Sequence, residues 1–287
     1  MMDAKTQRRD QAGSLYVVGT PIGNMEDLTD RARRVLAEVD LVAAEDTRTA
    51  GLLLQRLGIK GRLVSLFEGN EHARAPNLVE QLSGGVSVAL ISECGTPAIS
   101  DPGGILVAAC VAAGIDVVPV PGPSAVTTVL SVSGLAVDRF RFEGFLPRRG
   151  VARSRRIDVL KRDEAAAVIY ESPHRLAQTL MDLAEGLGGR RALVAREVTK
   201  MHEELVRGTL PDLAARYGGQ SVKGEVVVVI EGRPEGEGTT LSDDELEELM
   251  RERLAAGESA RDVARDLADQ TGRSRRELYA LAHRLRG

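Results

Sequence analysis

The chain contains no tryptophan, and it has only two cysteines and four histidines among its 287 residues. Cys94 and Cys110 are too few for a disulfide framework and are typical of a reducing compartment, which predicts a cytoplasmic protein. The histidines lack the spacing of metal ligands, so we expect no metal. No apolar run approaches the ~20 residues of a membrane span, so we expect no membrane segment.

An excess of positive charge is also missing, because the net charge is −4. Nucleic-acid binding therefore cannot be inferred from the total and depends on local clusters. Between Arg139 and Arg162, nine basic residues stand against two acidic ones. Such a cluster fits contacts to a phosphate backbone, and it fits a solvated helix face equally well. Its candidate RNA-contacting residues are Arg148, Arg149, Arg153, Arg155 and Arg156.

Short apolar runs alternate with helical patterns in the first half of the chain. The expected strands are Leu15–Thr20, Leu41–Ala44, Arg62–Phe67, Val86–Ile91 and Ile115–Val120. Helices are expected between them, for example at Glu71–Leu82 and Ile105–Ala113. Because these strands are apolar throughout rather than alternating, the pattern predicts a mostly parallel sheet with helices on both faces.

The second half contains more strands than helices, which predicts a mixed sheet in a second α/β domain. Its expected strands are Arg139–Phe145, Ala165–Ser172, Arg191–Glu197, Glu203–Thr209 and Glu225–Glu231. Three short helices follow, each opened by a capping box, and the turn at Thr271–Arg273 resembles that of a helix-turn-helix. The predicted divisions are a disordered N-terminus at 1–13, α/β domains at 14–122 and 123–232, a linker at 233–240 and a helical domain at 241–287.

Three loops rich in glycine and proline follow strands of the first domain, at Gly19–Asn24, Ser92–Gly103 and Pro121–Ala125. Open α/β sheets bind ligands at the carboxyl ends of their strands, so we expect the three loops to form one site. They lack the spacing of dinucleotide-binding and phosphate-binding loops, and none carries lysine or arginine. The expected ligand is therefore a nucleoside with a cationic or zwitterionic tail, such as a sulfonium, rather than a polyphosphate.

Carboxylates also lie at the predicted strand ends. Glu45 and Asp46 end the second strand, where Thr47 is expected to cap the next helix, and Glu93 and Asp101 flank the central loop. Any one of these acids is better explained as a helix cap or a surface ion pair. As a set at strand ends they favour a functional site.

Seven motifs in order strongly resemble the ribosomal RNA small subunit methyltransferase I family, which has the tetrapyrrole-methylase fold. They are Leu15–Asn24, Ala44–Arg48, Gly95–Gly103, Pro121–Ala125, Glu143–Pro147, Glu171–Arg175 and Arg196–Lys200. The resemblance runs from about Ser14 to Gly232, and the helical C-terminus resembles the domain appended in that family. In the central loop, Glu93 and Cys94 stand where the family usually has aspartate and alanine.

The resemblance implies transfer of a methyl group from S-adenosylmethionine to the 2′-hydroxyl of a cytidine in the decoding region of small-subunit ribosomal RNA. It implies a homodimer that acts on small-subunit RNA or the 30S subunit, with the cofactor cleft between the two α/β domains. Matched position by position, the cofactor-binding residues are Gly19, Thr20, Pro21, Gly95, Thr96, Pro97, Asp101, Ser124, Ala125 and Tyr170.

Methyl transfer to a sugar hydroxyl requires alignment with the sulfonium and a base that takes the hydroxyl proton. Glu45 or Asp46 is the predicted base, with Arg48 beside it in the catalytic set. Arg48, Arg175 and Lys200 are predicted to hold RNA phosphates. His174 is assigned to RNA as well, although a structural role at a helix start explains it equally well.

Two other functions remain open from the sequence. One is a methylase of the same fold that acts on a tetrapyrrole or a protein side chain, against which the basic cluster and the C-terminal helices argue. The other is a non-enzymatic RNA-binding assembly protein, against which the three loops argue.

Overall fold

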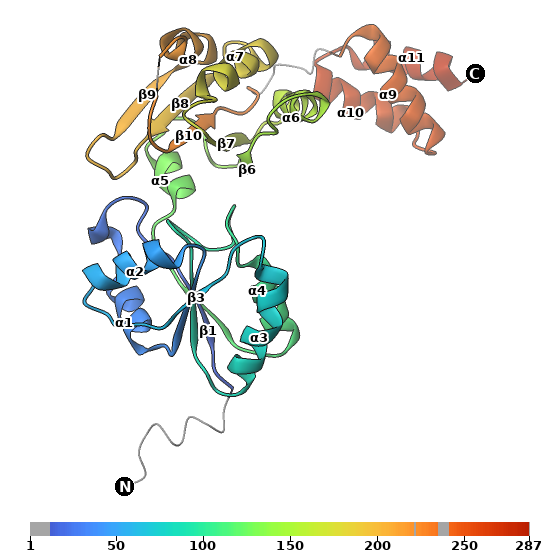
Figure 1. Cartoon of the computed structure of the whole chain (residues 1–287). Helices are drawn as coiled ribbons and strands as arrows, with labels where there is room; N and C mark the ends of the chain where they lie inside the picture. The colour runs from blue at the N-terminus through green and yellow to red at the C-terminus, as the bar shows by residue number, and fades with distance from the viewer. Residues whose placement is uncertain (1–11, 221, 235–240, 287) are drawn as a thin grey trace.

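The computed structural model describes residues 12–220, 222–234 and 241–286. Most of the N-terminus and linker predicted above lies outside these residues. Within them, the chain forms two α/β units, one above the other in Figure 1, and a group of three helices beside the second unit. No helix among the described residues is both long and apolar enough to cross a membrane.

The N-terminal unit is a five-stranded parallel sheet in the order β3-β2-β4-β1-β5. Its strands are β1 (Leu15–Val18), β2 (Leu41–Ala44), β3 (Leu63–Ser65), β4 (Val88–Ile91) and β5 (Val117–Val120). Helices α1 (Asp30–Glu38) and α2 (Thr47–Arg56) cover one face, and α3 (Glu71–Ser83) and α4 (Gly104–Ala112) cover the other (Figure 1). The predicted parallel sheet is confirmed, and two of its three inner strands, β2 and β4, are buried throughout because both faces are covered.

The second unit is a mixed five-stranded sheet in the order β6-β7-β10-β8-β9. Its strands are β6 (Phe140–Phe145), β7 (Ala166–Glu171), β8 (Arg191–Arg196), β9 (Glu204–Thr209) and β10 (Val226–Ile230). Only β6 and β7 are parallel, and the other neighbours pair antiparallel. Helices α6 (Val151–Arg162), α7 (Leu176–Leu187) and α8 (Leu210–Tyr217) share one core with the sheet.

The two units share packed surfaces, which fixes the site between them. Ile22, from the loop after β1, is buried in the core on the other face of the second sheet, together with α5 (Ala125–Ser131). A Cβ atom added to Gly23 would lie 2.6 Å from Lys200 Cγ and 2.7 Å from Thr199 Oγ1. The first glycine loop is therefore in van der Waals contact with the segment between β8 and β9.

The start of α2 differs from the sequence prediction. Asp46, not Thr47, is the N-cap, and its Oδ1 accepts a hydrogen bond of 2.8 Å from the Arg48 amide. Aspartate and threonine are both good N-cap residues, so adjacent candidates cannot be ranked from sequence alone. The capping role matters because Asp46 was one of two predicted bases.

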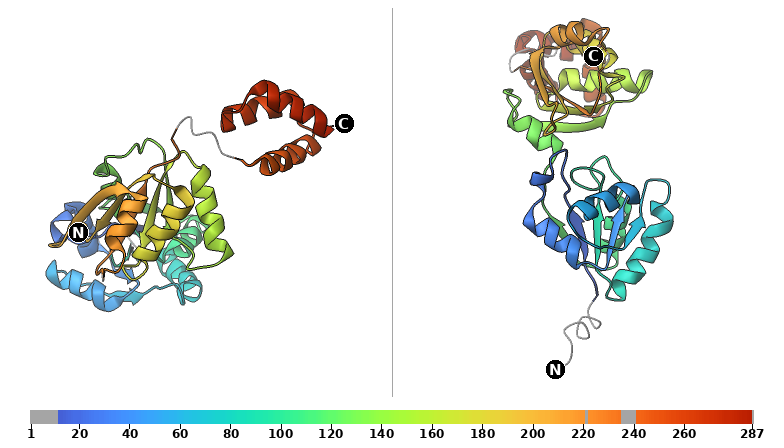
Figure 2. Two further views of the ribbon diagram at one scale, coloured as in Figure 1. Left: turned by 90° about the horizontal axis from the view of Figure 1, so that it is seen from above. Right: turned by 60° about the vertical axis from the view of Figure 1, so that its left-hand side comes forward.

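The C-terminal helices are α9 (Asp243–Ala255), α10 (Ala260–Thr271) and α11 (Arg275–Arg286), and they enclose a small apolar core of their own. In Figure 2 they stand beside the two sheets rather than between them. The predicted capping box of Ser242 and Glu245 is confirmed, because each side chain bonds the backbone of the other. Ser259 caps α10 by accepting from the Asp262 amide.

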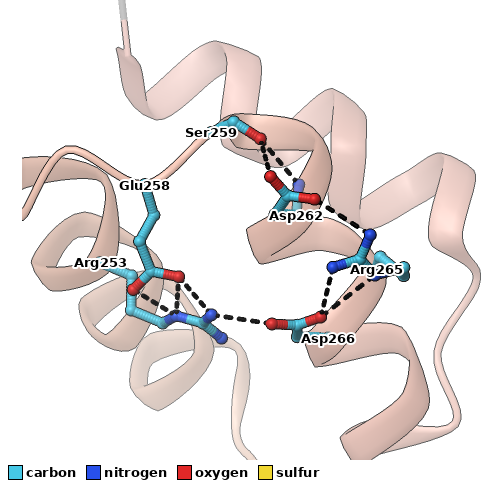
Figure 3. A network of polar contacts seen from close by, with 6 residues as sticks. All are labelled: Arg253, Glu258, Ser259, Asp262, Arg265 and Asp266. Carbon is cyan, nitrogen blue, oxygen red and sulfur yellow. Dashed lines mark hydrogen bonds and ion pairs between the residues drawn. The ribbon is translucent and has the colours of Figure 1, made fainter.

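One arginine connects α9 to α10. Arg253 is paired with Glu258 in the turn and donates to Asp266 of α10 at 3.0 Å (Figure 3). Hydrogen bonds from Arg253 lower the pKa of both carboxyls. Because the folded pKa values lie below the ordinary 4.5 and 3.8, this stabilisation is complete above the ordinary values. It is lost as the pH falls through the folded ones.

We therefore expect Arg253→Met to lower the melting temperature of the helical unit near neutral pH, with a smaller loss in acid. Arg251→Met is the matched control, because Arg251 pairs within α9, with Glu247 four residues earlier, and such exposed pairs contribute little. Thermal melts followed by circular dichroism test this. Equal melting temperatures for the two variants at neutral pH would contradict it.

Candidate functional site

The three glycine- and proline-rich loops converge, as the sequence predicts. Thr20 and Gly95 exchange two backbone hydrogen bonds of 2.9 and 3.1 Å, which joins the first loop to the second. A Cβ atom on Gly19 would lie 2.8 Å from both Cα and N of Gly122, which joins the first loop to the third. Contacts this close between backbones require glycine on both sides.

A cavity of about 390 Å³ opens where these loops face the second unit. This volume is within the roughly 300–1,000 Å³ of small-molecule sites. The wall from the first unit consists mainly of the central loop, and the facing wall includes Phe145, Tyr170 and the start of β10. Six predicted cofactor-binding residues line the cavity, namely Gly95, Thr96, Asp101, Ser124, Ala125 and Tyr170.

A second cavity of about 310 Å³ adjoins the first. The two share Ile22, Cys94 and Glu225 in their linings. Thr20 and Pro21 line this smaller cavity, together with leucines of α2 and the end of β4. Gly19 and Pro97 line neither cavity. The site is therefore a two-part space, with residues of both units at the boundary.

The backbone is strained next to the cavities. Ala98 and Ser100 in the central loop have φ values of 66° and 64°, and Glu197 and Thr199 in the facing segment have 50° and 68°. Non-glycine residues seldom adopt such φ values, and the residues that do so cluster at binding and catalytic sites. All four belong to the two segments that face each other across the site.

Aromatic rings form part of the wall in the second unit. Tyr170 meets Phe142 edge to face with centroids 4.9 Å apart, and it meets Phe145 at 5.9 Å. Burial raises the pKa of Tyr170 to about 12, so its phenol is neutral at physiological pH. A fixed, neutral aromatic surface suits contact with a planar base.

Acidic side chains surround the loops. Burial, with the nearby Asp101 and Glu93, raises the pKa of Glu45 above its ordinary value. Burial likewise raises the pKa of Asp101. Glu45 follows β2, whose last residue pairs with Ile91 of β4, so it lies beside the start of the central loop. Of the predicted catalytic residues Glu45, Asp46 and Arg48, none lines either cavity.

Asp46 and Arg48 bind each other. Arg48 Nη2 lies 2.7 Å from Asp46 Oδ2, although the arginine side chain is 89% exposed. Hydrogen bonds from Arg48 lower the pKa of Asp46 to about 2. A carboxylate with so low a pKa is a poor proton acceptor, so Glu45 is the better candidate of the two.

The predicted RNA-contacting residues separate into two groups. Arg148, Arg149, Arg155 and His174 are exposed. Arg153 is not, because only 7% of it is accessible and it lies 2.6 Å from Asp182 while donating to Thr179 and Pro147. This burial argues against the RNA contact predicted for Arg153, whose partners on α7 the sequence does not reveal.

Three further predicted RNA contacts are held by the protein itself. Arg156 Nη1 lies 3.1 Å from a carboxylate oxygen of Glu143, and Arg175 donates to the carbonyl of Leu146. Lys200 Nζ lies 2.9 Å from both Glu197 and Glu225, at the edge of the smaller cavity. All three cationic side chains are paired with groups of the protein itself, which argues against their binding RNA phosphates.

Cys94 lies in the lining of both cavities, where burial and neighbouring carboxylates raise the pKa of its thiol to about 11. It is therefore a poor nucleophile, even though the residue is exposed. The described residues contain no group of three or more His, Cys, Asp or Glu side chains that could hold a metal.

Some wall residues have no sequence signal of their own. Gly224–Val227 line the larger cavity from the start of β10, a segment that the sequence marks only as a buried strand. Their place in the wall depends on β10 lying at the centre of the second sheet, between β7 and β8. Ile99 and Ser100 were expected only as members of the central loop.

Comparison with known proteins adds independent support for the assignment of the fold. A family model described as Tetrapyrrole (Corrin/Porphyrin) Methylases matches residues 14–214. A ribosomal RNA small subunit methyltransferase I from Synechocystis sp. is 45% identical over 271 residues, which cover 94% of this chain and 97% of its own. The same-named protein of Haemophilus influenzae is 43% identical over 96% of this chain and 98% of its own.

The chain belongs to the ribosomal RNA small subunit methyltransferase I family. The fold agrees with solved tetrapyrrole methylases. Thermus thermophilus uroporphyrin-III-C-methyltransferase matches at a TM-score of 0.55 and 25% identity, over 76% of this chain and 94% of its own. A structure of that enzyme with S-adenosylhomocysteine bound has a TM-score of 0.55 at 21% identity, over 76% of this chain and 97% of its own.

Members of the family from Synechocystis and H. influenzae align along 94% and 96% of this chain. The two T. thermophilus structures cover 76% of this chain. The similarity to these relatives therefore reaches beyond the two α/β units and into the C-terminal helices.

Proposed function

We propose that this protein transfers a methyl group from S-adenosylmethionine to the 2′-hydroxyl of a cytidine in small-subunit ribosomal RNA. The observation that carries the proposal is the convergence of the three loops on one cavity between the units, in a chain of this family. The names of the relatives support ribosomal RNA as the substrate. The choice of nucleotide and atom follows from the family resemblance.

The larger cavity is the proposed cofactor site. Its lining includes the acidic residues Asp101, Glu171 and Glu225 but no lysine or arginine, a charge balance that suits a sulfonium cation rather than phosphate. Tyr170 offers a neutral ring for the adenine. The structure of the T. thermophilus enzyme with S-adenosylhomocysteine bound supports a ligand of the S-adenosylmethionine type.

The smaller cavity is the proposed site for the acceptor nucleoside. It adjoins the larger one at Cys94 and Ile22, so a methyl group near that boundary is accessible from both sides. Apolar side chains of α2 can contact a base, and Glu45 directly follows Ala44, which pairs with Ile91 in the lining of this cavity. Glu45 is the proposed base, because a raised pKa makes its carboxylate a better proton acceptor than Asp46.

RNA is proposed to lie along the exposed arginines before and within α6. We expect replacement of Arg148, Arg149 and Arg155 by alanine to weaken binding of small-subunit RNA and to flatten its dependence on salt. Each lost phosphate contact reduces the slope of log affinity against log salt by about 0.7 for single strands. Filter binding at several salt concentrations measures this.

The matched control replaces Arg31, Arg33 and Arg34 of α1, which are exposed and carry the same charge. An equal loss of affinity in both triple variants would show that the effect comes from net charge alone. It would assign the segment around α6 to a solvated surface.

The proposed activity is tested by incubating the protein with labelled S-adenosylmethionine and small ribosomal subunits that lack the modification, then mapping 2′-O-methyl groups. We expect incorporation at one cytidine of the decoding region. A porphyrinogen and the proteins of the subunit serve as alternative acceptors in parallel reactions. Label found only in one of these would replace the proposal with another methylase activity, and label in none would favour an RNA-binding assembly protein.

A further inference from the structure

Glu71 is a buried glutamate of the first unit, and one of its carboxylate oxygens accepts three backbone hydrogen bonds. It is the first residue of α3, and only 4% of it is accessible. Its Oε1 accepts backbone hydrogen bonds from Gly103 at 3.0 Å, Ile105 at 2.8 Å and Leu106 at 3.1 Å. One side chain from α3 thus caps the N-terminus of α4.

The cap lies where the central loop ends. Gly103 is the N-cap of α4 and has a φ of 124°, and a Cβ there would lie 2.7 Å from a methyl carbon of Leu90. The loop before it carries the strained Ala98 and Ser100, and the Ala98 amide donates to the Pro102 carbonyl. A strained loop needs fixed ends to keep its shape, and Glu71 supplies the fixed end on the helix side.

We propose that Glu71 is a positioning residue of the cofactor site, which holds the Ser92–Gly103 loop in its binding conformation through the N-terminus of α4. The carboxylate also fills the place at which a free helix N-terminus would attract an anion. The loop therefore presents Asp101 to the cavity without an unpaired positive helix end behind it. An acidic side chain at the cavity and a neutralised helix end behind it suit a ligand with a cationic centre.

Asn70 extends the anchor back to the sheet. Its side chain accepts from the Phe67 amide at 2.9 Å and donates to the Ser65 carbonyl at 3.3 Å. The turn between β3 and α3 is thereby fixed before Glu71 reaches α4. A chain of hydrogen bonds connects an outer strand of the sheet to the end of the loop.

Two variants of the same size separate the parts of this role. Glu71→Gln keeps an oxygen that can accept the three bonds but loses the charge, and Glu71→Leu removes the acceptor. Leu78→Ala is the control, because Leu78 lies on the same helix, is buried and has no hydrogen bond to the loop. It destabilises the fold by an ordinary cavity cost.

Hydrogen exchange of the ligand-free protein tests the positioning itself. In the leucine variant we expect amides of residues 92–106 to exchange at least about tenfold faster, with a smaller change in the glutamine variant. The control should leave the ratio of loop exchange to exchange elsewhere in the unit unchanged. Unchanged loop protection in both Glu71 variants would overturn the proposal.

Calorimetric titration with S-adenosylhomocysteine tests the connection to the cofactor, which rests on the proposed function. We expect the dissociation constant to rise about tenfold for Glu71→Gln and roughly a hundredfold for Glu71→Leu, because charge-assisted bonds are about twice as strong as neutral ones. Turnover at saturating cofactor should stay within about threefold for Glu71→Gln. If Leu78→Ala had the same melting temperature as a Glu71 variant and raised the dissociation constant equally, the effect of Glu71 would be one of general stability rather than of positioning the loop.

Hydrogen exchange and calorimetry together distinguish a failure of the proposed function from a failure of the inference about Glu71. Loss of loop protection in a protein that binds no S-adenosylhomocysteine would contradict the proposed function while supporting the role of Glu71 in the loop. Binding by the unsubstituted protein, with no effect of either Glu71 variant, would contradict only the inference.

Discussion

Glu45→Gln is expected to reduce methyl transfer by about a hundredfold or more, because removal of a general base typically costs 10²–10⁴ in rate. Binding of S-adenosylhomocysteine should stay within about threefold, since Glu45 lines neither cavity. Single-turnover rates with small ribosomal subunits, together with calorimetry, measure both quantities. The substitution keeps the shape of the side chain, so a folding defect is not the expected cause.

Two controls separate Glu45 from its acidic neighbours. Asp46→Asn removes the ionised carboxylate from the N-cap of α2, and Glu93→Gln changes an exposed carboxylate of the smaller cavity. We expect both to keep most of the activity. If Asp46→Asn abolishes turnover while Glu45→Gln does not, the two roles are the reverse of those proposed.

The pH dependence of turnover provides a second check on the same residue. The base must be ionised, so the rate rises with pH through its pKa. Because the pKa of Glu45 is raised from 4.5, the acid limb should lie above that value and should disappear in Glu45→Gln. A limb that persists in this variant belongs to another group. It cannot belong to Asp46, whose pKa is about 2, because that group stays ionised throughout an ordinary assay range.

Gly19→Ala is expected to raise the dissociation constant for S-adenosylhomocysteine by roughly a hundredfold or more. The new methyl group would lie 2.8 Å from the backbone of Gly122, and backbone atoms cannot avoid it by changing a rotamer. The first and third loops must then separate, which moves Ser124 away from Thr96 across the cavity. Calorimetry measures the loss.

Gly122→Ala tests the same contact from the other side, because its Cβ would lie 2.8 Å from the Gly19 carbonyl oxygen. The matched control is Gly189→Ala, where no atom lies within 4 Å and the backbone does not require glycine. Undiminished binding in both Gly19→Ala and Gly122→Ala would show that the loops need not touch for the ligand to bind.

The sequence predicted the first sheet and the meeting of the loops for one physical reason. Fully apolar strands indicate a parallel sheet, and the carboxyl ends of parallel strands share an edge. The places of Thr20, Gly95 and Ser124 follow from that rule without any knowledge of strand order. The glycines then mark the points at which backbones approach most closely.

Burial of single charged side chains could not be predicted in the same way. Arg153 is one of several arginines in a basic run, and its burial depends on which face of α6 packs against α7. Lys200 meets Glu225 only because β10 lies beside β8 in the sheet. Such contacts connect residues far apart in the chain, so the local sequence around one residue does not identify its partner.

The measurement that tests the central claim most directly is a calorimetric titration of the full chain with S-adenosylhomocysteine, repeated with Gly19→Ala and Glu45→Gln. The account predicts one saturable site per chain, abolished or strongly weakened by the first substitution and retained in the second. No binding by the unsubstituted chain, or binding that Gly19→Ala leaves intact, would contradict the claim that the three loops together hold the methyl donor.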